Sequence, residues 1–318
     1  MTESRIGVGV DVGGTTVKLG LFSERGELLK KWEIPTDHTD DCANLIPDIA
    51  ASIRGTLSRE GIGFERLMGA GMGVPGPVQA DGYVEVCVNL HWKNRYPARE
   101  LSELLSGIPC YLANDANAAA LGEAWRGGGS GAKEAVLITL GTGVGGGVIM
   151  NGHIVPGRHG LGGEIGHMHV RDDEAEQCNC GGYGCLEQVA SATGIVREAK
   201  RVLASTEEHS RMREKGDGLT ARDVCDLGRE GDPLADRVME TVGRYLGLAI
   251  SHIALTLDPE VFVIGGGVSR AGEYLRNKVQ KYYDQFTPIS RNRGRVVMAS
   301  LGNDAGIYGA VRLILPDL

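Results

Sequence analysis

Three of the seven cysteines in this chain lie within eight residues, at Cys178, Cys180 and Cys185. Glycines separate them, so the backbone there can fold around one small ion. His167 lies a short loop upstream and supplies a fourth ligand. Three thiolates and one imidazole form a closed tetrahedral Zn²⁺ site, which is structural in type because no position is left for water. The pattern therefore predicts zinc bound by these four side chains.

Two alternatives to this ligand set stay open on the sequence alone. His169 is a second imidazole that could take the place of His167. The cysteines could instead form one disulfide and a spare thiol, but the chain looks cytosolic, and disulfides are rare there.

Two carboxylates, Glu164 and Glu187, flank the cysteine cluster. Folding of the cluster would bring them towards one place, where they could hydrogen-bond to neighbouring sugar hydroxyls. The alternative is that both are ordinary solvated loop acids.

Glycine-rich turns at three places suit the binding of a nucleotide. The first holds Asp11, Gly13, Gly14, Thr15, Thr16 and Lys18 between two strand-like runs. Its N–H groups, hydroxyls and ammonium could hold phosphates, and Asp11 could bind Mg²⁺. The second contains Gly141, Thr142 and Gly143 and repeats the same strand–turn–strand pattern. The third, Gly265, Gly266 and Gly267, follows an apolar strand and could lie against an adenine or ribose ring. For all three the alternative is a plain tight turn.

Asp115 stands between a predicted strand, 109–113, and a segment of high helix propensity, 116–123. It could be a helix cap or a general base that points into a cleft. The two roles are compatible, because an acid at a helix start is kept ionised and fixed in place.

The elements that must position these residues alternate between strands and helices. Apolar spacing predicts a helix over 41–61, a helical segment over 191–214, a helix after Thr220 and another over 234–257, and short apolar runs predict the strands. A rigid turn, Pro75-Gly76-Pro77, ends the strand 68–74. An amphipathic helix at 306–315 should pack back on the first domain.

Composition places the chain among globular proteins. Of its 318 residues 42 % are hydrophobic, and the formal charge is 33 − 41 = −8, which disfavours nucleic acid as a partner. No apolar run is long enough for a signal peptide core or a membrane span, so the expected location is the cytoplasm.

Five motifs in this order resemble the ROK family of repressors, open reading frames and sugar kinases. They are Asp11–Thr15, Asn114–Glu123, Gly141–Gly147, Gly163–His167 and Cys178–Glu187. The run 185–194 is most similar to the family branch that phosphorylates glucose. Two mild departures are His91, where glycine is commoner in the family, and the acidic loop 170–177. Family repressors carry a DNA-binding domain before the first motif, and about ten residues there leave no room for one.

The resemblance implies an α/β fold of the actin-like ATPase (ribonuclease H-like) type, a duplication of two α/β domains with an inter-domain cleft. The expected division is 1–116 plus 302–318 for the smaller domain and 117–301 for the larger, zinc-bearing one. The implied reaction is transfer of the γ-phosphoryl group of ATP, with Mg²⁺, to the 6-hydroxyl of glucose. The family often forms homodimers or homotetramers.

The same resemblance implies a role for each candidate residue. Asp115 would be the catalytic base, and the two turns at 13–16 and 141–143 would hold the phosphates. His167 would ligate zinc through one nitrogen and face the sugar through the other. The sugar-binding residues would be Gly76, Asn89, Asn114, Asp115, Glu164, His167 and Glu187.

The sequence is compatible with three rival functions. The substrate could be fructose, mannose, N-acetylglucosamine or N-acetylmannosamine. The phosphoryl donor could be polyphosphate, although the negative net charge disfavours a polyanion. The chain could also be a non-catalytic sugar sensor, which the intact Asn114-Asp115 pair argues against.

Overall fold

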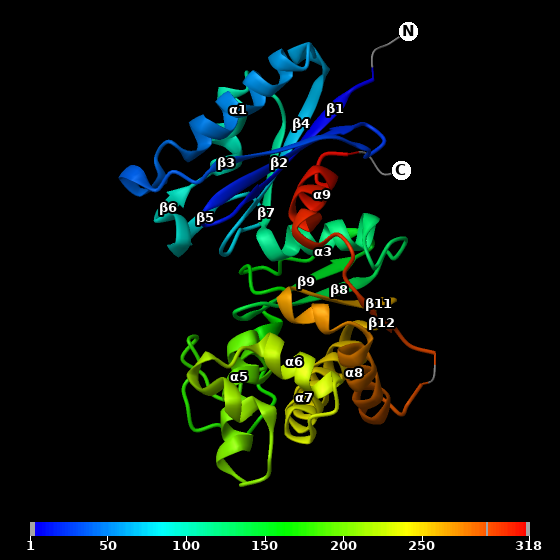
Figure 1. Cartoon of the computed structure of the whole chain (residues 1–318). Coiled ribbons are helices and arrows are strands. Elements are labelled where there is room, and N and C mark those ends of the chain that lie inside the picture. Colours follow the sequence, from blue (N-terminus) through cyan, green and yellow to red (C-terminus); the bar gives the residue numbers. More distant parts are fainter. Residues whose placement is uncertain (1–3, 291, 316–318) are drawn as a thin grey trace. The chain divides into compact units, whose positions relative to one another are not determined.

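The computed structural model describes residues 4–290 and 292–315, which fall into two compact units (Figure 1). The first unit comprises the chain up to Gly131, Gly147–Gly163 and the segment from Asn303, and the second comprises Ala132–Gly146 and Glu164–Gly302. Two units were predicted, the first of them discontinuous. The division differs from 1–116 plus 302–318 and 117–301, of which 1–3, 291 and 316–318 lie outside the described residues.

The difference in the division has a packing cause. The helix that follows Asn114 belongs to the first unit because it lies against the C-terminal helix. A side chain at Gly122 would collide with the backbone of Ala305, and one at Gly309 with that of Ala118. These glycines therefore let the two helices approach closely. Gly147 lies close to Ala116 and Ala120 of the helix that follows Asn114, so residues 147–163 belong to this unit as well.

The first unit is built on a five-stranded sheet of order β3-β2-β1-β4-β7. Strands β1, β2 and β3 pair antiparallel, whereas β1, β4 and β7 are parallel. The elements of this unit are β1 Ile6–Val12, β2 Thr16–Ser23, β3 Leu28–Pro35, α1 Leu45–Arg59, β4 Leu67–Val74, β5 Val84–Cys87, β6 Trp92–Arg95, α2 Pro97–Leu104, β7 Cys110–Asn114, α3 Asp115–Arg126, β10 His153–Ile154 and α9 Ala305–Arg312.

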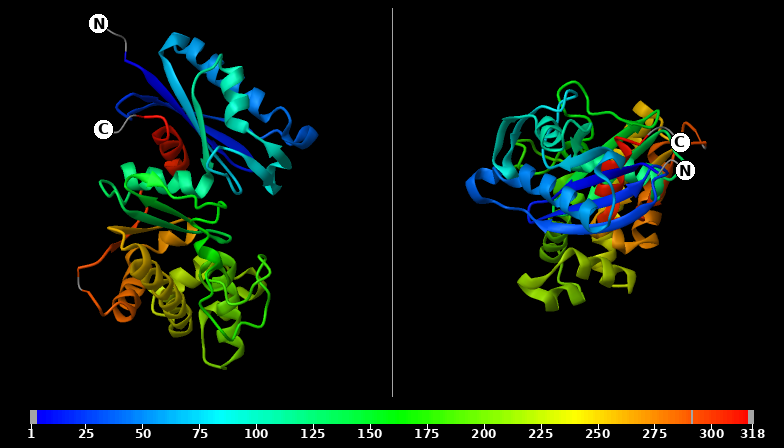
Figure 2. Two further views of the ribbon diagram at one scale, coloured as in Figure 1. Left: turned by 180° about the vertical axis from the view of Figure 1, so that it is seen from behind. Right: turned by 90° about the horizontal axis from the view of Figure 1, so that it is seen from above.

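Helices cover both faces of this sheet (Figures 1 and 2). On one face α1 buries Leu45, Ile46, Ile49, Ile53 and Leu57, which are the apolar positions that predicted it. On the other face lies α9, with Ile307 and Val311 packed on Phe22. Glycines at 9 and 71 admit the α9 backbone, because a side chain at either would meet the carbonyl of Ile307 or Ala310. The predicted C-terminal helix thus packs on the first sheet.

The second sheet repeats the plan of the first. Its order is β10-β9-β8-β11-β12, with β8, β11 and β12 parallel. In both sheets a run of three consecutive strands is extended by two parallel strands on one side, which is the arrangement expected of a duplicated unit. The chain division at Gly147 falls within β9 Val144–Met150, so the end of β9 and β10 are counted with the first unit although both strands belong to the second sheet. The remaining elements are β8 Ala135–Leu140, α4 Glu187–Ala190, α5 Ala192–Ala204, α6 Ala221–Arg229, α7 Pro233–Leu257, β11 Val261–Gly265, α8 Glu273–Phe286 and β12 Arg295–Met298.

Several local predictions were incomplete or wrong. The helix predicted over 191–214 ends at Ala204, and residues 211–218 form 3-10 turns instead. Strand β9 begins at Val144, directly after the predicted turn Gly141–Gly143. His91 adopts a left-handed φ of 56°, a conformation that favours glycine, which fits the commoner residue of the family at this place. Among the described residues no helix is long and apolar enough to cross a membrane.

Candidate functional site

The carboxyl ends of the parallel strands β1, β4 and β7 meet at one edge of the first sheet. Asp11 in β1 is paired with Gly73 in β4, and Val74 with Asn114 in β7. Ligands of open α/β sheets bind at this edge. Strand register therefore brings Asp11 and the Asn114-Asp115 pair together.

Asn114, rather than Asp115, is the N-cap of α3. Its Oδ1 accepts from the N–H groups of Ala116 and Asn117, at 2.9 and 3.1 Å. Its Nδ2 donates to the carbonyl oxygen of Gly76 at 3.1 Å and to Oδ1 of Asp115 at 3.0 Å. Asp115 is the first helical residue, and its Oδ1 also accepts from Ala116 N–H at 2.8 Å. These donors stabilise the ionised carboxylate and fix its direction.

Gly76 and Asn89 lie on two neighbouring loops of the first unit. Gly76 has a φ of 90° and packs against Cys87, so only glycine fits there without strain. Asn89 is exposed on the 3-10 turn Val88–Leu90 that follows β5.

Asp11 and Lys18 face each other across the first hairpin, with Oδ2 and Nζ 3.9 Å apart. Burial raises the pKa of Asp11 to about 6, Lys18 opposes the shift, and the charge of Asp115 adds to it. A carboxyl group with that balance is suited to a cation, because a divalent ion would favour the ionised form.

A pocket of about 630 Å³ lies within the second unit. Strand β11 runs parallel to β8, with Gly265 paired to Thr139, so the turns that follow both strands lie at one edge. The pocket is lined by Gly141 and Thr142 of one predicted turn and by Gly267 of another, whereas Gly143, Gly265 and Gly266 are not among its lining residues. Its volume is within the range of small-molecule sites.

One wall of this pocket is formed by helix α6 and its N-cap, which the sequence did not predict as part of a site. The residues of this wall that line the pocket are Thr220, Ala221, Arg222, Cys225, Asp226 and Arg229. The helix itself was predicted, because Thr220 and Asp223 form a capping box. Nothing in its sequence pattern indicates a ligand, and only the tertiary fold places it here.

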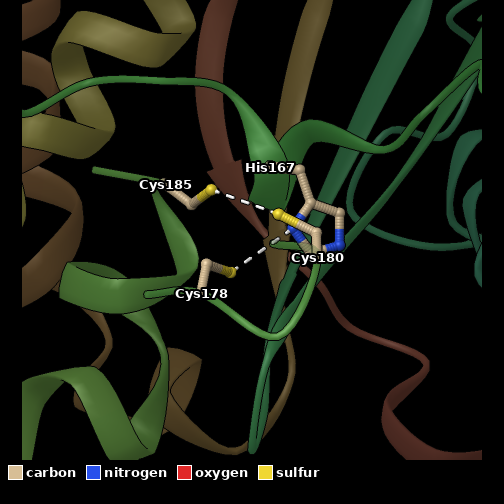
Figure 3. Close-up of side chains that lie close together, drawn as sticks. All are labelled: His167, Cys178, Cys180 and Cys185. Carbon is tan, nitrogen blue, oxygen red and sulfur yellow. Dashed lines mark hydrogen bonds between the residues drawn. The ribbon is translucent and has the colours of Figure 1, made fainter. Parts of the chain in front are cut away.

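The four predicted metal ligands converge in the structure (Figure 3). One ligand atom from each of His167, Cys178, Cys180 and Cys185 lies within 4.8 Å of all the others. The sulfur atoms of Cys180 and Cys185 are 3.6 Å apart, and Cys178 Sγ is 3.8 Å from His167 Nδ1. Zn–S bonds of about 2.3 Å in a tetrahedron require edges of about 3.8 Å, so the geometry fits zinc.

The structure places His169 outside this group. Its Nδ1 lies 2.7 Å from the carbonyl oxygen of Tyr183, and its Nε2 lies 2.9 Å from Oδ1 of Asp172. Both ring nitrogens are therefore engaged elsewhere. In His167, by contrast, Nδ1 faces Cys178 and Nε2 lies 3.9 Å from Oε2 of Glu164.

Glu187 links the cysteine cluster to the second glycine turn. Its Oε2 accepts from the N–H of Val144 at 3.0 Å, and its Oε1 lies 3.8 Å from Cys178 Sγ. A side chain at Gly143 would collide with this carboxylate. Glu164 is half exposed beside His167.

The sequence from residue 7 to residue 316 matches the model of the ROK family. The chain belongs to the ROK family. A curated relative from Halalkalibacterium halodurans, named glucokinase, is 42 % identical to this ROK chain over 311 residues, which cover 96 % of the chain and 94 % of the relative.

Solved ROK structures match nearly the whole chain. A ROK hexokinase from Thermus thermophilus superimposes with a TM-score of 0.81 at 30 % identity and covers 98 % of both chains. A ROK family glucokinase from Streptomyces griseus, in complex with glucose and AMPPNP, gives a TM-score of 0.74 at 32 % identity and covers 97 % of this chain and 99 % of the other. The predicted actin-like ATPase fold is confirmed.

Proposed function

We propose that this ROK protein is a glucokinase, which transfers the γ-phosphoryl group of ATP to the 6-hydroxyl of glucose and releases glucose 6-phosphate and ADP. Two observations support it. Relatives named glucokinase match nearly the whole chain. The observation that carries the chemistry is the carboxylate of Asp115, held at the edge of the first sheet by Asn114 and by a helix N-terminus.

Asp115 is the general base of the proposed reaction. It accepts the proton of the 6-hydroxyl as that oxygen attacks the γ-phosphorus of ATP. The bond between the γ-phosphorus and the bridging oxygen breaks, and ADP leaves with the electron pair. Such transfers depend mostly on positioning and charge stabilisation, so the carboxylate must be fixed as well as basic.

Backbone N–H groups of the two glycine turns hold the phosphates in this proposal, with Lys18 adding positive charge. Asp11 would hold Mg²⁺, which when bound offsets the negative charge of the phosphates. The residues assigned to the nucleotide are Asp11, Gly13, Gly14, Thr15, Thr16, Lys18, Gly141, Thr142, Gly143, Gly265, Gly266 and Gly267. The pocket between Gly267 and α6 would take the adenosine.

The sugar hydroxyls would be bound by Gly76, Asn89, Asn114, Glu164, His167 and Glu187. Zinc, held by His167 and the three cysteines, would fix the loop that carries Glu164 and Glu187. The orientation of His167 supports this, because its Nε2 faces Glu164 while Nδ1 faces the thiols.

A thiolate metal site requires reduced cysteines, so we place the protein in the cytoplasm. The homodimer or homotetramer implied by the family is a further proposal, which light scattering would test. Analysis of the reaction mixture tests the function itself. Magnesium-ATP and glucose should give ADP and a phosphate ester at the sixth carbon, identified by phosphorus–proton correlation NMR. Tight glucose binding without any product would favour the sugar sensor.

A further inference from the structure

The backbone carbonyls of the first glycine turn are hydrogen-bonded to residues 36–38, the segment that follows β3. Oγ1 of Thr36 donates to the carbonyl oxygen of Gly13 at 2.7 Å. Nε2 of His38 lies 2.5 Å from the carbonyl oxygen of Gly14. The backbone N–H of Thr36 donates to the carbonyl of Thr15 at 3.0 Å. Three consecutive carbonyls of the turn are thus tied to one short segment.

These contacts determine where the N–H groups of the turn point. In a planar trans peptide the C=O and the following N–H point in opposite directions. Holding the carbonyls of Gly13 and Gly14 therefore aims the N–H groups of Gly14 and Thr15 away from Thr36 and His38. Gly14 and Thr15 are exposed, and within the described part of the chain their N–H groups donate to no protein acceptor. They are available to an anion.

The carbonyl oxygen of Gly14 determines which nitrogen of His38 carries the hydrogen. To donate to Gly14, Nε2 must carry the hydrogen, which leaves Nδ1 as an acceptor. Nδ1 lies 3.7 Å from Sγ of Cys42, which is fully buried. Burial raises the pKa of the Cys42 thiol, so the sulfur keeps its hydrogen and can donate it to the ring.

The second turn shows the same arrangement, built from different residues. The N–H of Ala192 donates to the carbonyl oxygen of Gly141 at 2.8 Å. Oγ1 of Thr193 donates to the carbonyl oxygen of Thr142 at 2.9 Å. The N–H groups of Thr142 and Gly143 are directed away from these contacts for the same reason. In each turn, therefore, a threonine hydroxyl donates to a backbone carbonyl oxygen, from Thr36 in the first turn and from Thr193 in the second.

We propose that Thr36, His38 and Thr193 are positioning residues for the phosphoryl donor. They hold the carbonyls of the two turns so that the N–H groups face the phosphates, without themselves touching the nucleotide. The inference rests on the proposed function, because it takes both turns as phosphate-binding. It adds three side chains that lie outside the glycine motifs.

Paired substitutions test this role. Thr36→Val removes the hydroxyl at nearly constant shape, and Thr36→Ser keeps it. We measure the dissociation constant of magnesium-bound AMPPNP, and separately that of glucose, by calorimetry. The valine variant should bind AMPPNP about fivefold more weakly, as expected for one lost hydrogen bond, whereas the serine variant should stay within about twofold of wild type. Glucose affinity should not change. Thr193→Val and Thr193→Ser should repeat the pattern.

The matched control is Thr256→Val, which removes a hydroxyl that donates to the His252 carbonyl at 2.7 Å within α7. It should leave both affinities unchanged. His38 is exposed, so His38→Ala gives a folded variant even if Thr36→Val does not. It should weaken AMPPNP binding, and His38→Gln, whose amide can donate to Gly14, should restore part of it.

Wild-type AMPPNP affinity in Thr36→Val, Thr193→Val and His38→Ala alike would overturn the inference. A wild-type protein that binds AMPPNP but makes no glucose 6-phosphate would instead overturn the proposed function. The nucleotide affinities of the variants would still decide the positioning role.

Discussion

Nδ2 of Asn114 donates a hydrogen bond to Oδ1 of Asp115 at 3.0 Å and a second to the carbonyl of Gly76 at 3.1 Å. The same asparagine caps α3 through its other side-chain atom. One side chain therefore fixes the helix start, the loop after β4 and the carboxylate. We infer that the role of Asn114 is to hold Asp115 ionised and oriented.

Asp115→Asn should reduce turnover by about a hundredfold or more, because the amide cannot accept the proton of the hydroxyl. Asparagine has the shape of aspartate, and its oxygen can still accept from Ala116, so glucose affinity should stay within about threefold of wild type. Steady-state kinetics and calorimetry measure the two quantities. A variant that retained more than about a tenth of the wild-type rate would show that Asp115 is not the base.

Cys180→Ser should lose the bound metal and weaken glucose binding, because a serine hydroxyl is a poor zinc ligand. Cys110→Ser is the control, since Cys110 lies in β7 of the other unit and outside the metal group. Plasma mass spectrometry gives the zinc content of each purified protein. Equal zinc in wild type and Cys180→Ser would rule out the ligand assignment.

Two adjacent glycines after β11 should respond differently to alanine. Gly266 has a φ of 83°, and a Cβ there would lie 2.5 Å from the Leu140 carbonyl oxygen, so Gly266→Ala should lower the free energy of unfolding by about 1–3 kcal/mol. A Cβ on Gly267 meets nothing within 4 Å, so Gly267→Ala should be as stable as wild type. Because Gly267 lines the pocket, that variant should raise the KM for ATP and leave glucose affinity unchanged. Urea unfolding measures the stability of each variant, and steady-state kinetics measure its KM for ATP. An unchanged KM for ATP in Gly267→Ala would contradict the placement of adenosine in this pocket.

Glu174 carries a prediction for stability and its pH dependence. Its side chain is fully buried and bonded to Arg201 and Arg197, and hydrogen bonding to Arg201 lowers the pKa of Glu174 to about 2. Glu174→Gln should lower the free energy of unfolding by about 3 kcal/mol at pH 7, because two arginines lose their buried, negatively charged partner. The ionised Glu174 contributes its full share of stability above its ordinary pKa of 4.5, and this share is lost as the pH falls towards 2. The difference in unfolding free energy between wild type and Glu174→Gln should therefore shrink between pH 4.5 and pH 2.

Glu176→Gln is the matched control, because Glu176 pairs with the same Arg197 but its side chain is 62 % exposed. Its cost should stay below about 1 kcal/mol. Equal costs for the two variants, measured by urea unfolding, would contradict the importance of burial in this network.

The sequence predicted those parts of the site that have local causes. Cys178, Cys180 and Cys185 are close in the chain, so their convergence needs only a short loop. Asp11 and Asn114 are far apart in the chain, but each lies at the carboxyl end of an apolar strand, and parallel strands bring these ends to one edge.

Other features depend on tertiary contacts that a single sequence does not display. Strand β3 was missed because Leu28–Pro35 alternates exposed and half-buried residues along the sheet edge, with lysines among them. The exclusion of His169 as a ligand needed the positions of Tyr183 and Asp172. The contacts of Thr36 and His38 with the first turn likewise follow from the pairing of β2 with β3.

Comparison of catalytic efficiencies tests the central claim most directly. ADP release from magnesium-ATP would be measured with glucose, fructose, mannose, N-acetylglucosamine and N-acetylmannosamine. We predict that kcat/KM for glucose exceeds every other value by at least tenfold, about 1.4 kcal/mol in transition-state free energy. A different leading sugar would contradict the assignment to glucose while keeping the kinase, and no turnover with any sugar would contradict the kinase itself.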